Sequence, residues 1–439
     1  MLHSIFRRSG LSRLSRASGV LPLAVLVLTG AIAVACGSDK SRSFDEDPNL
    51  PGGSNGQTPN GVLGDGDGGK PELKAVGTLT GTVYAPEGTV PIANALIYLG
   101  GSLPAPIPDH AYCDKCVQLP AGTPFTYSKA DGTFELPIYS PGQAYLIVQK
   151  GQFRRARPIT TTEGTQAVDK PLTTFPGASN SAVGDDIPRI GVAGGGFDKI
   201  EISLKKLGLT QFDRYGQGLF EPKGLPPAVS QFTWDLVKSQ ETLSKYHIVL
   251  LPCGFTGLEC KSLPTSGQQK MLRDYVEGGG KVYVTDYSYE VVRQIWPGFI
   301  TWKDGNDKEL TDMSQWGVAC QPGQYDLDGK AEDPGLGAWL SAIGESSFKL
   351  KGSYTLISKV TPQQGKDADG NPTTITPKVW MSSVKGPQTV TFDDQCGRVL
   401  FSTYHAEGDD DTNLLAQEKA LLYILLEASV CIGPAQQPH

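Results

Sequence analysis

The chain has 439 residues, of which 39% are hydrophobic, with 53 Gly and 32 Pro. This is long enough for two or three separate cores joined by much loop. The formal net charge is −7 at pH 7, and an acidic chain without a basic stripe is poorly suited to nucleic acid, so we expect no nucleic-acid partner.

Residues 1–35 have the pattern of an export signal. Four arginines lie within the first sixteen residues, ahead of the apolar run GVLPLAVLVLTGAIAVA at 19–35. A positive flank, an apolar run and then small residues are typical of a signal peptide. A membrane-spanning helix is the alternative, but the run contains Pro22 and Gly30 and falls short of the ~20 residues that a span needs.

Cys36 directly follows AVA at 33–35, and this stretch resembles a bacterial lipobox, although Leu is more usual where Ala33 stands. The resemblance implies cleavage before Cys36 and acylation of its thiol and amine. We therefore expect an extracytoplasmic protein that is lipid-anchored to a bacterial membrane, with plain secretion as the alternative. Gly37 stands where some inner-membrane lipoproteins carry Asp, which favours the outer membrane.

Residues 36–75 predict a disordered tether behind this anchor. Half of residues 51–70 are Gly or Pro, and apolar residues are scarce. Such a segment buries too little apolar surface to offset the entropy lost on ordering it.

Residues 76–165 are expected to be all-β. Short runs rich in β-branched and aromatic residues alternate with Gly, Pro and Asp, and KADGTFEL carries an Asp-Gly hairpin signal. The stretches GTVYAPEG, PIANALIYL, DGTFELP and PGQAYLIVQKG resemble the carboxypeptidase regulatory-like (transthyretin-like) family. The resemblance implies a small Greek-key β-sandwich that serves as a spacer or accessory module. It implies no peptidase chemistry, because the metal-ligand motifs of the associated peptidases are not found here.

After a polar linker at 166–186, the pattern changes to alternating strands and helices over 187–432, with a tail at 433–439. YHIVLLPC, KVYVTDY and GRVLFSTYH are apolar runs of the kind buried on both faces of a parallel sheet, and GQQKMLRDYVEGGG and NLLAQEKALLYILLEAS are typical of helices. This alternation predicts an α/β doubly wound domain. Residues 300–375 fit it poorly and are expected to be an insertion.

The first helix of this domain is expected in FDKIEISLKKLGL. Phe197, Ile200, Leu204 and Leu207 recur at helical spacing, so we expect them to share one buried face, with Gly208 ending the helix.

The stretches YHIVLLPCG, LRDYVEGGGKVYVTD and GRVLFSTYHAEG resemble the flavodoxin-like class I glutamine amidotransferase superfamily, and within it the trehalose-utilisation-like branch. In the catalytic members, a cysteine stands on the turn after the strand that follows the glycine-rich helix end, and a later strand ends in His-x-Glu. This chain keeps His405 and Glu407, but Asp286 or Tyr287 stands in place of the cysteine. The whole arrangement resembles bacterial lipoproteins that combine these two modules.

The replacement changes the chemistry that the domain can do. A carboxylate is a poor nucleophile toward an amide, and the small residues that would shape an oxyanion hole are replaced by Asp, Tyr, Ser and Tyr. We therefore expect a non-catalytic binding or structural role in the cell envelope, with an envelope protein or a glycan as partner. The residues expected around such a ligand are Cys253, Asp286, Tyr287, His405 and Glu407.

A hydrolase or amidase is the alternative function. Cys253 or Ser288 would be its nucleophile, with His405 and Glu407 as the base and its partner. A histidine at a strand end can equally be a structural residue, and a disulfide between Cys253 and Cys260 would remove the thiol.

The cysteine count fits an exported chain. Of eight cysteines, one is the lipid site, and most of the others should form disulfides in an oxidising compartment. HAYCDKC does not stand at a helix start, as a redox motif would, and no His follows its second cysteine, as haem attachment would need. A zinc site with His110 would need a second pair of ligands nearby, which the sequence does not offer. We therefore expect a loop disulfide there and neither metal nor cofactor. The expected pairs are Cys113–Cys116, Cys253–Cys260 and Cys320–Cys396, which leaves Cys431.

Overall fold

The computed structural model describes residues 74–216, 224–255, 265–320, 325–406 and 413–428, which belong to one compact unit of the chain. The expectations for the export signal, Cys36, Cys260, Glu407 and Cys431 lie outside the described residues. Among the described residues, no helix is long and apolar enough to cross a membrane.

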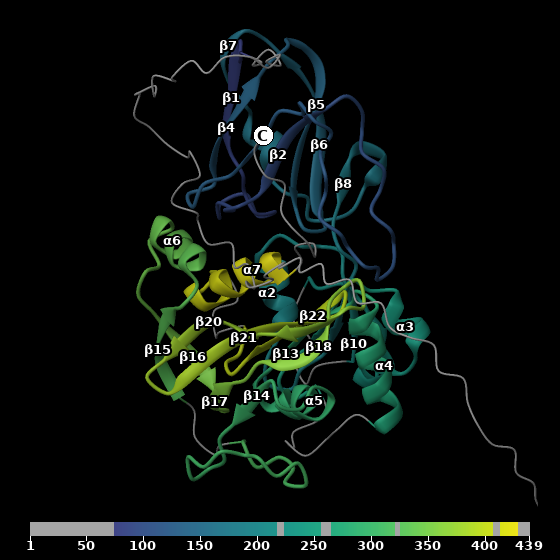
Figure 1. Cartoon of the computed structure of the whole chain (residues 1–439), viewed down its shortest axis with the longest axis vertical. Helices are drawn as coiled ribbons and strands as arrows, with labels where there is room; N and C mark the ends of the chain where they lie inside the picture. The colour runs from purple at the N-terminus through teal and green to yellow at the C-terminus, as the bar shows by residue number, and fades with distance from the viewer. Residues whose placement is uncertain (1–73, 217–223, 256–264, 321–324, 407–412, 429–439) are drawn as a thin grey trace, which may run out of the picture. The chain divides into compact units, whose positions relative to one another are not determined.

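The first part of the described chain is built from two small sheets (Figure 1). One sheet has the order β4-β1-β7, with β1 antiparallel to β4 and parallel to β7. The other has the order β3-β2-β5-β6-β8 and is antiparallel throughout. The strands are β1 (Gly77–Thr82), β2 (Leu96–Gly100), β3 (Phe125–Tyr127), β4 (Thr133–Ile138), β5 (Gly142–Lys150), β6 (Phe153–Thr161), β7 (Gly164–Ala167) and β8 (Asp185–Asp186).

The two sheets share one apolar core. Leu79 and Phe134 of the first sheet and Leu146 and Val148 of the second are all buried in the same cluster. In β4, buried residues alternate with more exposed ones, as expected for a strand with one face on a core. The expected Asp-Gly turn forms, with Gly132 at φ 78°, but the hairpin prediction is wrong, because β3 and β4 belong to different sheets.

The segment expected as a plain linker, 166–186, instead adds structure to this first part. It contains α1 (Lys170–Thr173), the 3-10 turn η1 (Ser181–Val183) and β8. The polar residues that suggested a linker are ion-pair partners: Arg154 Nε donates to Asp186 Oδ2 at 3.0 Å, and Arg155 Nε donates to Asp185 Oδ1 at 2.8 Å. These pairs join β8 to the edge strand β6.

A ten-stranded sheet organises the rest of the described chain, with the order β11-β10-β9-β12-β13-β22-β21-β20-β15-β16. The first six strands are parallel to their neighbours and the last four pair antiparallel. The parallel strands are β9 (Ile190–Ala193), β10 (Asp213–Tyr215), β11 (Ala228–Ser230), β12 (Ile248–Leu251), β13 (Lys281–Thr285) and β22 (Gly397–Ser402). In chain order, β10-β9-β12-β13-β22 runs 2-1-3-4-5, which is the flavodoxin-like order.

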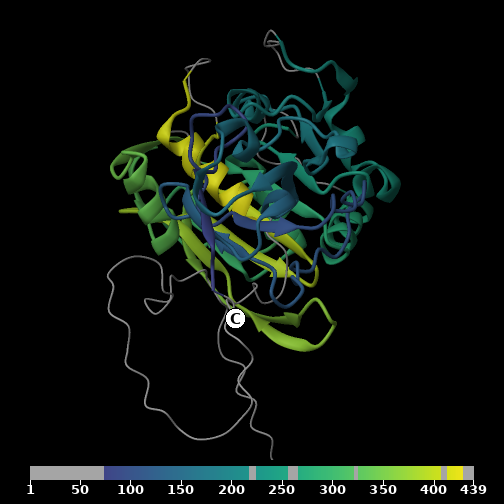
Figure 2. The same ribbon diagram turned by 90° about the horizontal axis from the view of Figure 1, so that it is seen from above.

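Helices cover both faces of this sheet. Ile248 and Leu250 share a core with α2 and α7, whereas the alternate residues Val249 and Leu251 share a second core with α3, α4 and α5. Figure 1 shows α2 and α7 on one side of the sheet and α5 on the other, and in Figure 2 the yellow α7 runs across the α/β part. The helices are α2 (Ile200–Lys206), α3 (Gln240–Ser244), α4 (Ser266–Glu277), α5 (Tyr289–Ile295), α6 (Pro334–Ala342) and α7 (Ala416–Ala428), with 3-10 turns η2 (Thr233–Val237) and η3 (Asp286–Ser288).

The expectation for α2 is correct except at its start. Ile200, Leu204 and Leu207 are buried, and Gly208 follows the helix with φ 78°. Phe197 precedes the helix and is 44% exposed, because the turn after β9 extends to Lys199 before the helix begins.

The segment expected as an insertion, 300–375, divides into two kinds of structure. β15 and β16 extend the main sheet at its antiparallel edge, whereas β14 pairs only with β17 and β18 only with β19. The remaining strands are β14 (Ile300–Trp302), β15 (Tyr325–Ala331), β16 (Phe348–Ser353), β17 (Ile357–Val360), β18 (Gln363–Lys366), β19 (Pro372–Ile375), β20 (Lys378–Ser383) and β21 (Gly386–Asp394).

The predicted disulfide pairs are wrong. Cys113 is bonded to Cys396, 283 residues away, which excludes both Cys113–Cys116 and Cys320–Cys396. Cys116 and Cys320 are disulfide-bonded as well, so the expectation of an oxidised chain stands. Cys253 is free and buried, which excludes the bond to Cys260. Sequence proximity misled the pairing, because the loop after β2 lies against the turn between β21 and β22, and this brings the Cα atoms of Cys113 and Cys396 within 5.0 Å.

Candidate functional site

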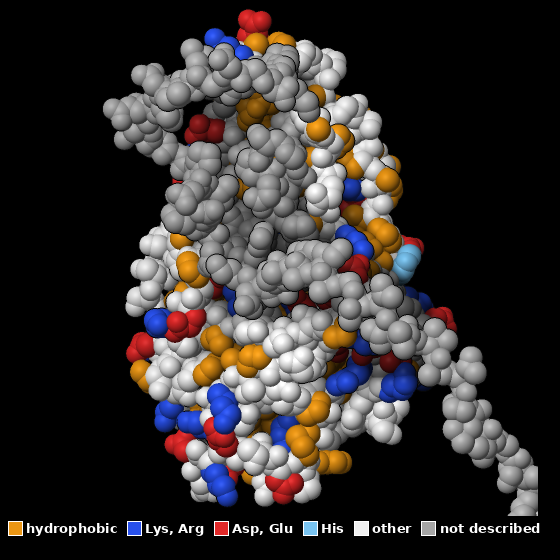
Figure 3. All heavy atoms as spheres, viewed as in Figure 1, with side chains coloured by type: hydrophobic (Ala, Val, Ile, Leu, Met, Phe, Trp, Pro, Cys, Tyr) orange, Lys and Arg blue, Asp and Glu red, His pale blue; other side chains and the backbone are white. Residues whose placement is uncertain are grey.

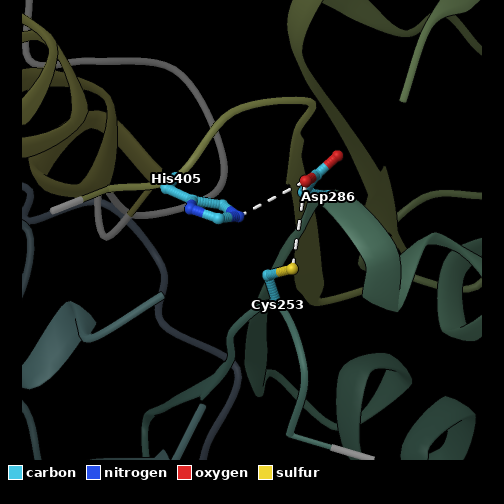
Figure 4. Close-up of side chains that lie close together, drawn as sticks. All are labelled: Cys253, Asp286 and His405. Carbon is cyan, nitrogen blue, oxygen red and sulfur yellow. Dashed lines mark hydrogen bonds and ion pairs between the residues drawn. The ribbon is translucent and has the colours of Figure 1, made fainter. Parts of the chain in front are cut away.

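Three side chains meet at the carboxyl edge of the parallel strands. Cys253 follows β12, Asp286 follows β13 and His405 follows β22. These strands are adjacent and parallel, so their carboxyl ends lie at one edge, where ligands of doubly wound sheets usually bind. Figure 4 shows the three side chains pointing toward one another.

The distances among these groups are short. His405 Nε2 lies 3.4 Å from Asp286 Oδ2, and the Cys253 thiol lies 3.9 Å from the same oxygen. The Cys253 sulfur, one carboxylate oxygen of Asp286 and one ring nitrogen of His405 all lie within 4.8 Å of one another. Cys253 and Asp286 are buried, and the His405 side chain is 13% exposed, so any access to this cluster is on the side of His405.

Asp286 sits on a sharp turn in a sparsely populated backbone conformation. Its φ is 43°, and it joins β13 directly to the short 3-10 turn η3 and then to α5. Residues held in this way cost roughly 1–3 kcal/mol each and persist where the surroundings fix them. Here the backbone N–H of Tyr354 and the hydroxyl of Thr355 donate to Asp286 Oδ1 at 3.2 and 2.9 Å. Both donors follow β16, so the expected insertion supplies part of the site.

A buried carboxylate behind the cluster connects the three strand ends. Asp198, after β9, accepts the hydroxyl of Thr285 at 2.8 Å and the backbone N–H of Ala406 at 3.1 Å. The Thr285 hydroxyl oxygen in turn accepts the backbone N–H of Cys253 at 2.7 Å. One acidic side chain thereby positions the backbone next to Cys253, Asp286 and His405.

Burial controls the titration of the cluster. It raises the pKa of the Cys253 thiol well above its usual value, and the charge of Asp286 raises it further. Burial also raises the pKa of Asp286, although its hydrogen bond to His405 acts in the opposite direction. Burial and the neighbouring carboxylate raise the pKa of Tyr287 to about 12. The thiol is therefore mainly protonated at neutral pH while its surroundings stay as they are.

Aromatic rings line the approach beside His405. The Tyr354 ring lies 5.6 Å from the His405 ring, Tyr287 lies 5.4 Å from Tyr354, and Phe197 lies 6.3 Å from Tyr287. Tyr287 and Tyr354 are half-buried and Phe197 is exposed. Tyr287, predicted as a ligand contact, thus belongs to an aromatic wall next to the cluster.

Some of these residues were expected from the sequence and others were not. Cys253, Asp286, Tyr287 and His405 were expected at one edge of the sheet, and the structure places all four there. Ser288 is buried and donates to the carbonyl oxygen of Pro252 at 2.8 Å, and Glu407 lies outside the described residues.

Asp198, Thr285 and Tyr354 were not named as site residues. A signal for Asp198 was present, since it follows the GGGF turn after the first strand of the domain. Nothing in the sequence brings Tyr354 to this edge, because it reaches the site only through the pairing of β16.

Searches for similar proteins found resemblance in three dimensions only. No family model matches the chain, and no curated protein resembles it in sequence. Among the solved structures that resemble it is a protein described as part of a GMP synthase from Thermoplasma acidophilum, at 9% identity over 55% of this chain and 94% of that one, with a TM-score of 0.32. PurLQS from Thermotoga maritima is 10% identical over 54% of this chain and 97% of that one, with a TM-score of 0.31. A ThuA-like protein from Parabacteroides merdae is 13% identical over 55% of this chain and 88% of that one, with a TM-score of 0.30.

Proposed function

We propose that this chain is an exported, lipid-anchored cell-envelope protein whose α/β part binds a ligand at the carboxyl edge of its sheet, and that this site acts by binding and not by acyl transfer. The observation that carries the proposal is the identity of the residue on the turn after β13. A carboxylate, Asp286, stands there, and its oxygens are already engaged with Tyr354, Thr355 and His405.

Neither of the two possible nucleophiles is activated. Acyl transfer from an amide needs a thiolate or an alkoxide that a base generates. The Cys253 thiol lies beside a buried carboxylate, and burial together with that carboxylate raises its pKa. The Ser288 hydroxyl donates a hydrogen bond to the Pro252 carbonyl oxygen, so His405 is not its acceptor in this arrangement.

The chemistry of the edge limits the ligand. Asp286 and Asp198 are both fully buried, so two carboxyl groups lie behind the surface that a ligand would meet. The aromatic wall adds apolar faces that also attract cations. A cationic or neutral ligand suits such an edge better than an anionic one. An uncharged part of an envelope protein, or a neutral glycan, would be such a ligand.

The position in the envelope rests on the N-terminal pattern. A signal peptide at 1–35 and a lipid on Cys36 would tether the chain to a membrane, with the outer membrane favoured, and 36–75 would separate the folded part from the lipid. We assign the β part to the transthyretin-like sandwiches as a spacer. Its two sheets over one core support that assignment. We propose no nucleic-acid partner, because the net charge is −7; in the part of Figure 3 that is not grey, blue and red side chains are interspersed.

A thiol hydrolase remains the second candidate, and one observation favours it. Cys253 is free and its sulfur lies within 4.8 Å of a His405 nitrogen, which is near enough for a modest movement to form a Cys–His pair. Asp286 would then have to leave its place between them or orient the imidazole.

Trapping of an acyl group separates the two functions. The full mature chain, purified with its disulfides intact, is incubated with an activated acyl ester, an acyl thioester and a fluorophosphonate, both as purified and after treatment with a chelator. Peptide mass spectrometry then reads Cys253 and Ser288. We expect no adduct on either residue. An adduct on Cys253 or Ser288 that disappears in His405→Gln, while surface lysines label equally in both proteins, would overturn the proposal in favour of the hydrolase.

A further inference from the structure

We propose that Cys253, Asp286 and His405 form a mononuclear site for a divalent metal ion of the zinc class. The inference rests on the proposed function, because it names a ligand of the same edge. The observation is the convergence of three different donor types from three strand ends onto one small volume, with Cys253 Sγ, one Asp286 carboxylate oxygen and one His405 nitrogen within 4.8 Å of one another (Figure 4).

The spacing suits one ion bound to all three atoms. Zinc binds sulfur at ~2.3 Å, imidazole nitrogen at ~2.0 Å and carboxylate oxygen at ~2.0–2.2 Å, so tetrahedral ligands lie roughly 3.3–3.6 Å apart. The measured separations are 3.4 Å for nitrogen to oxygen and 3.9 Å for sulfur to oxygen. With the third pair at no more than 4.8 Å, a point equidistant from the three atoms lies at most about 2.4 Å from each, and the sulfur and the nitrogen would move toward a separation of ~3.5 Å on binding the ion in tetrahedral geometry.

The donor set selects the kind of ion. A thiolate excludes Ca²⁺ and Mg²⁺, which prefer oxygen ligands, and sulfur, nitrogen and oxygen together suit zinc and its neighbours in the first transition row. A thiolate and a carboxylate carry two negative charges into a buried place, and a divalent cation balances them. Three protein ligands also leave a fourth position for water or a ligand, as in zinc sites that keep an open position and not as in closed structural ones.

The surroundings hold the donors in place before an ion arrives. Asp198 accepts hydrogen bonds from the Thr285 hydroxyl and from the N–H of Ala406, and the Thr285 hydroxyl oxygen accepts one from the N–H of Cys253. One buried hydrogen-bond network therefore fixes the backbone beside each of the three metal-ligating residues. The backbone N–H of Tyr354 and the hydroxyl of Thr355 donate to Asp286 Oδ1, and partners of this kind on a ligating side chain are typical of metal centres, where their loss weakens metal binding ~10–100-fold.

Space is also reserved for the imidazole. A Cβ on residue 352 would lie 3.1 Å from Cγ and Nδ1 of the His405 ring, and Gly352 has φ 73°. Any other side chain there would both strain the backbone and displace the ring.

The redox state of the cysteines agrees with this role. Cys113, Cys116, Cys320 and Cys396 are all disulfide-bonded, whereas Cys253 is a free thiol. In an exported chain whose other described cysteines are oxidised, metal ligation gives this thiol a chemical role, and coordination would protect it from oxidation.

Cobalt binding tests the site directly. The full mature chain, with its disulfides intact, is dialysed against a chelator and titrated with Co²⁺ under nitrogen. We expect one equivalent to bind and to give a sulfur-to-cobalt charge-transfer band together with the intense visible bands of a four-coordinate ion, and one equivalent of Zn²⁺ to remove both. Cys253→Ser should lose the charge-transfer band, and Asp286→Asn and His405→Gln should weaken binding by more than the ~10–100-fold of an outer partner.

Two further variants separate ligation from folding. Ser288→Ala removes a buried hydrogen bond at the same edge but none of the three metal-ligating atoms, so this variant should keep the full cobalt spectrum and the full cobalt affinity. Asp198→Asn should keep the charge-transfer band and lose affinity ~10–100-fold. Circular dichroism establishes which variants fold, and only folded variants are compared.

Two results would overturn the inference. One is a folded chain that binds no stoichiometric cobalt, and the other is a charge-transfer band that survives in Cys253→Ser. Failure here differs from failure of the proposed function. An acyl adduct on Cys253 that depends on His405 contradicts the binding role whatever the metal result, whereas a chain that forms no such adduct and binds no cobalt loses only the metal site.

Discussion

His247 offers a pH-dependent test of the fold at the end of β12 opposite Cys253. The ring is 1% exposed. Its Nδ1 accepts the backbone N–H of Arg189 at 2.8 Å, and its Nε2 donates to the carbonyl oxygen of Pro108 at 2.9 Å. These partners require a neutral ring with its proton on Nε2. Burial lowers the pKa of His247 to about 4, and the positive charges of Lys281, Arg189 and His110 act in the same direction, whereas the hydrogen bond to Pro108 opposes them.

The sign and the size of the effect follow from linkage. In the unfolded chain His247 titrates near 6.5, so between pH 6.5 and 4 the unfolded state binds more protons than the folded state, and stability falls as the pH falls. At ~1.36 kcal/mol per pH unit, the free energy of unfolding should lose about 2 kcal/mol by pH 5 and about 3 kcal/mol by pH 4 from this residue alone. Above pH 6.5 the contribution is complete and constant.

Urea unfolding of the full mature chain at pH 7.5, 6, 5 and 4.5 measures this loss against a variant. His247→Asn keeps an acceptor for the Arg189 N–H but loses the bond to Pro108, so it should be less stable at pH 7.5 by about 1–2 kcal/mol. Between pH 7.5 and 5, the wild-type protein should lose about 2 kcal/mol more stability than the variant, which has no imidazole to protonate at this position, so the difference between them should vanish or change sign by pH 5. A difference that stays constant, or grows in favour of the wild type, toward pH 5 would refute the reasoning.

Three further predictions concern the site, the core and the anchor. Gly352→Ala should weaken cobalt binding at least tenfold, because the added Cβ would contact the His405 ring. Gly344→Ala is the control, because Gly344 has a similar φ and a Cβ there would have no atom within 4 Å. An equal loss of affinity in both variants would contradict the steric argument. Lys150→Met leaves Glu427 buried without its partner at 2.5 Å, so urea unfolding should show a loss of about 3–5 kcal/mol. Lys150→Met with Glu427→Leu should regain most of that loss, and failure to do so would count against an unpaired charge as the cause. Cys36→Ser should abolish incorporation of labelled fatty acid, and a wild-type chain that takes up no label would exclude the lipid anchor.

The strands of the parallel half of the sheet could be predicted from the sequence, because they are buried on both faces. In β12 and β13 every residue is buried, so the strands appear as continuous apolar runs, and glycine-ended helices separate them. The antiparallel half was not readable in this way. β15 and β16 have mixed burial and lie at an edge, and their membership of the sheet depends on pairing with β20, which local patterns do not encode.

The sequence by itself determined which side chains end the parallel strands, and hence that Cys253, Asp286 and His405 share one edge. Strand direction and connection fix that edge, and both follow from local periodicity. Only the tertiary structure decided that Cys253 stays free while Cys113 reaches Cys396, and that Asp198 joins the strand ends. Disulfide partners and buried hydrogen bonds depend on distances of a few ångströms between residues far apart in the chain, and packing alone sets those distances.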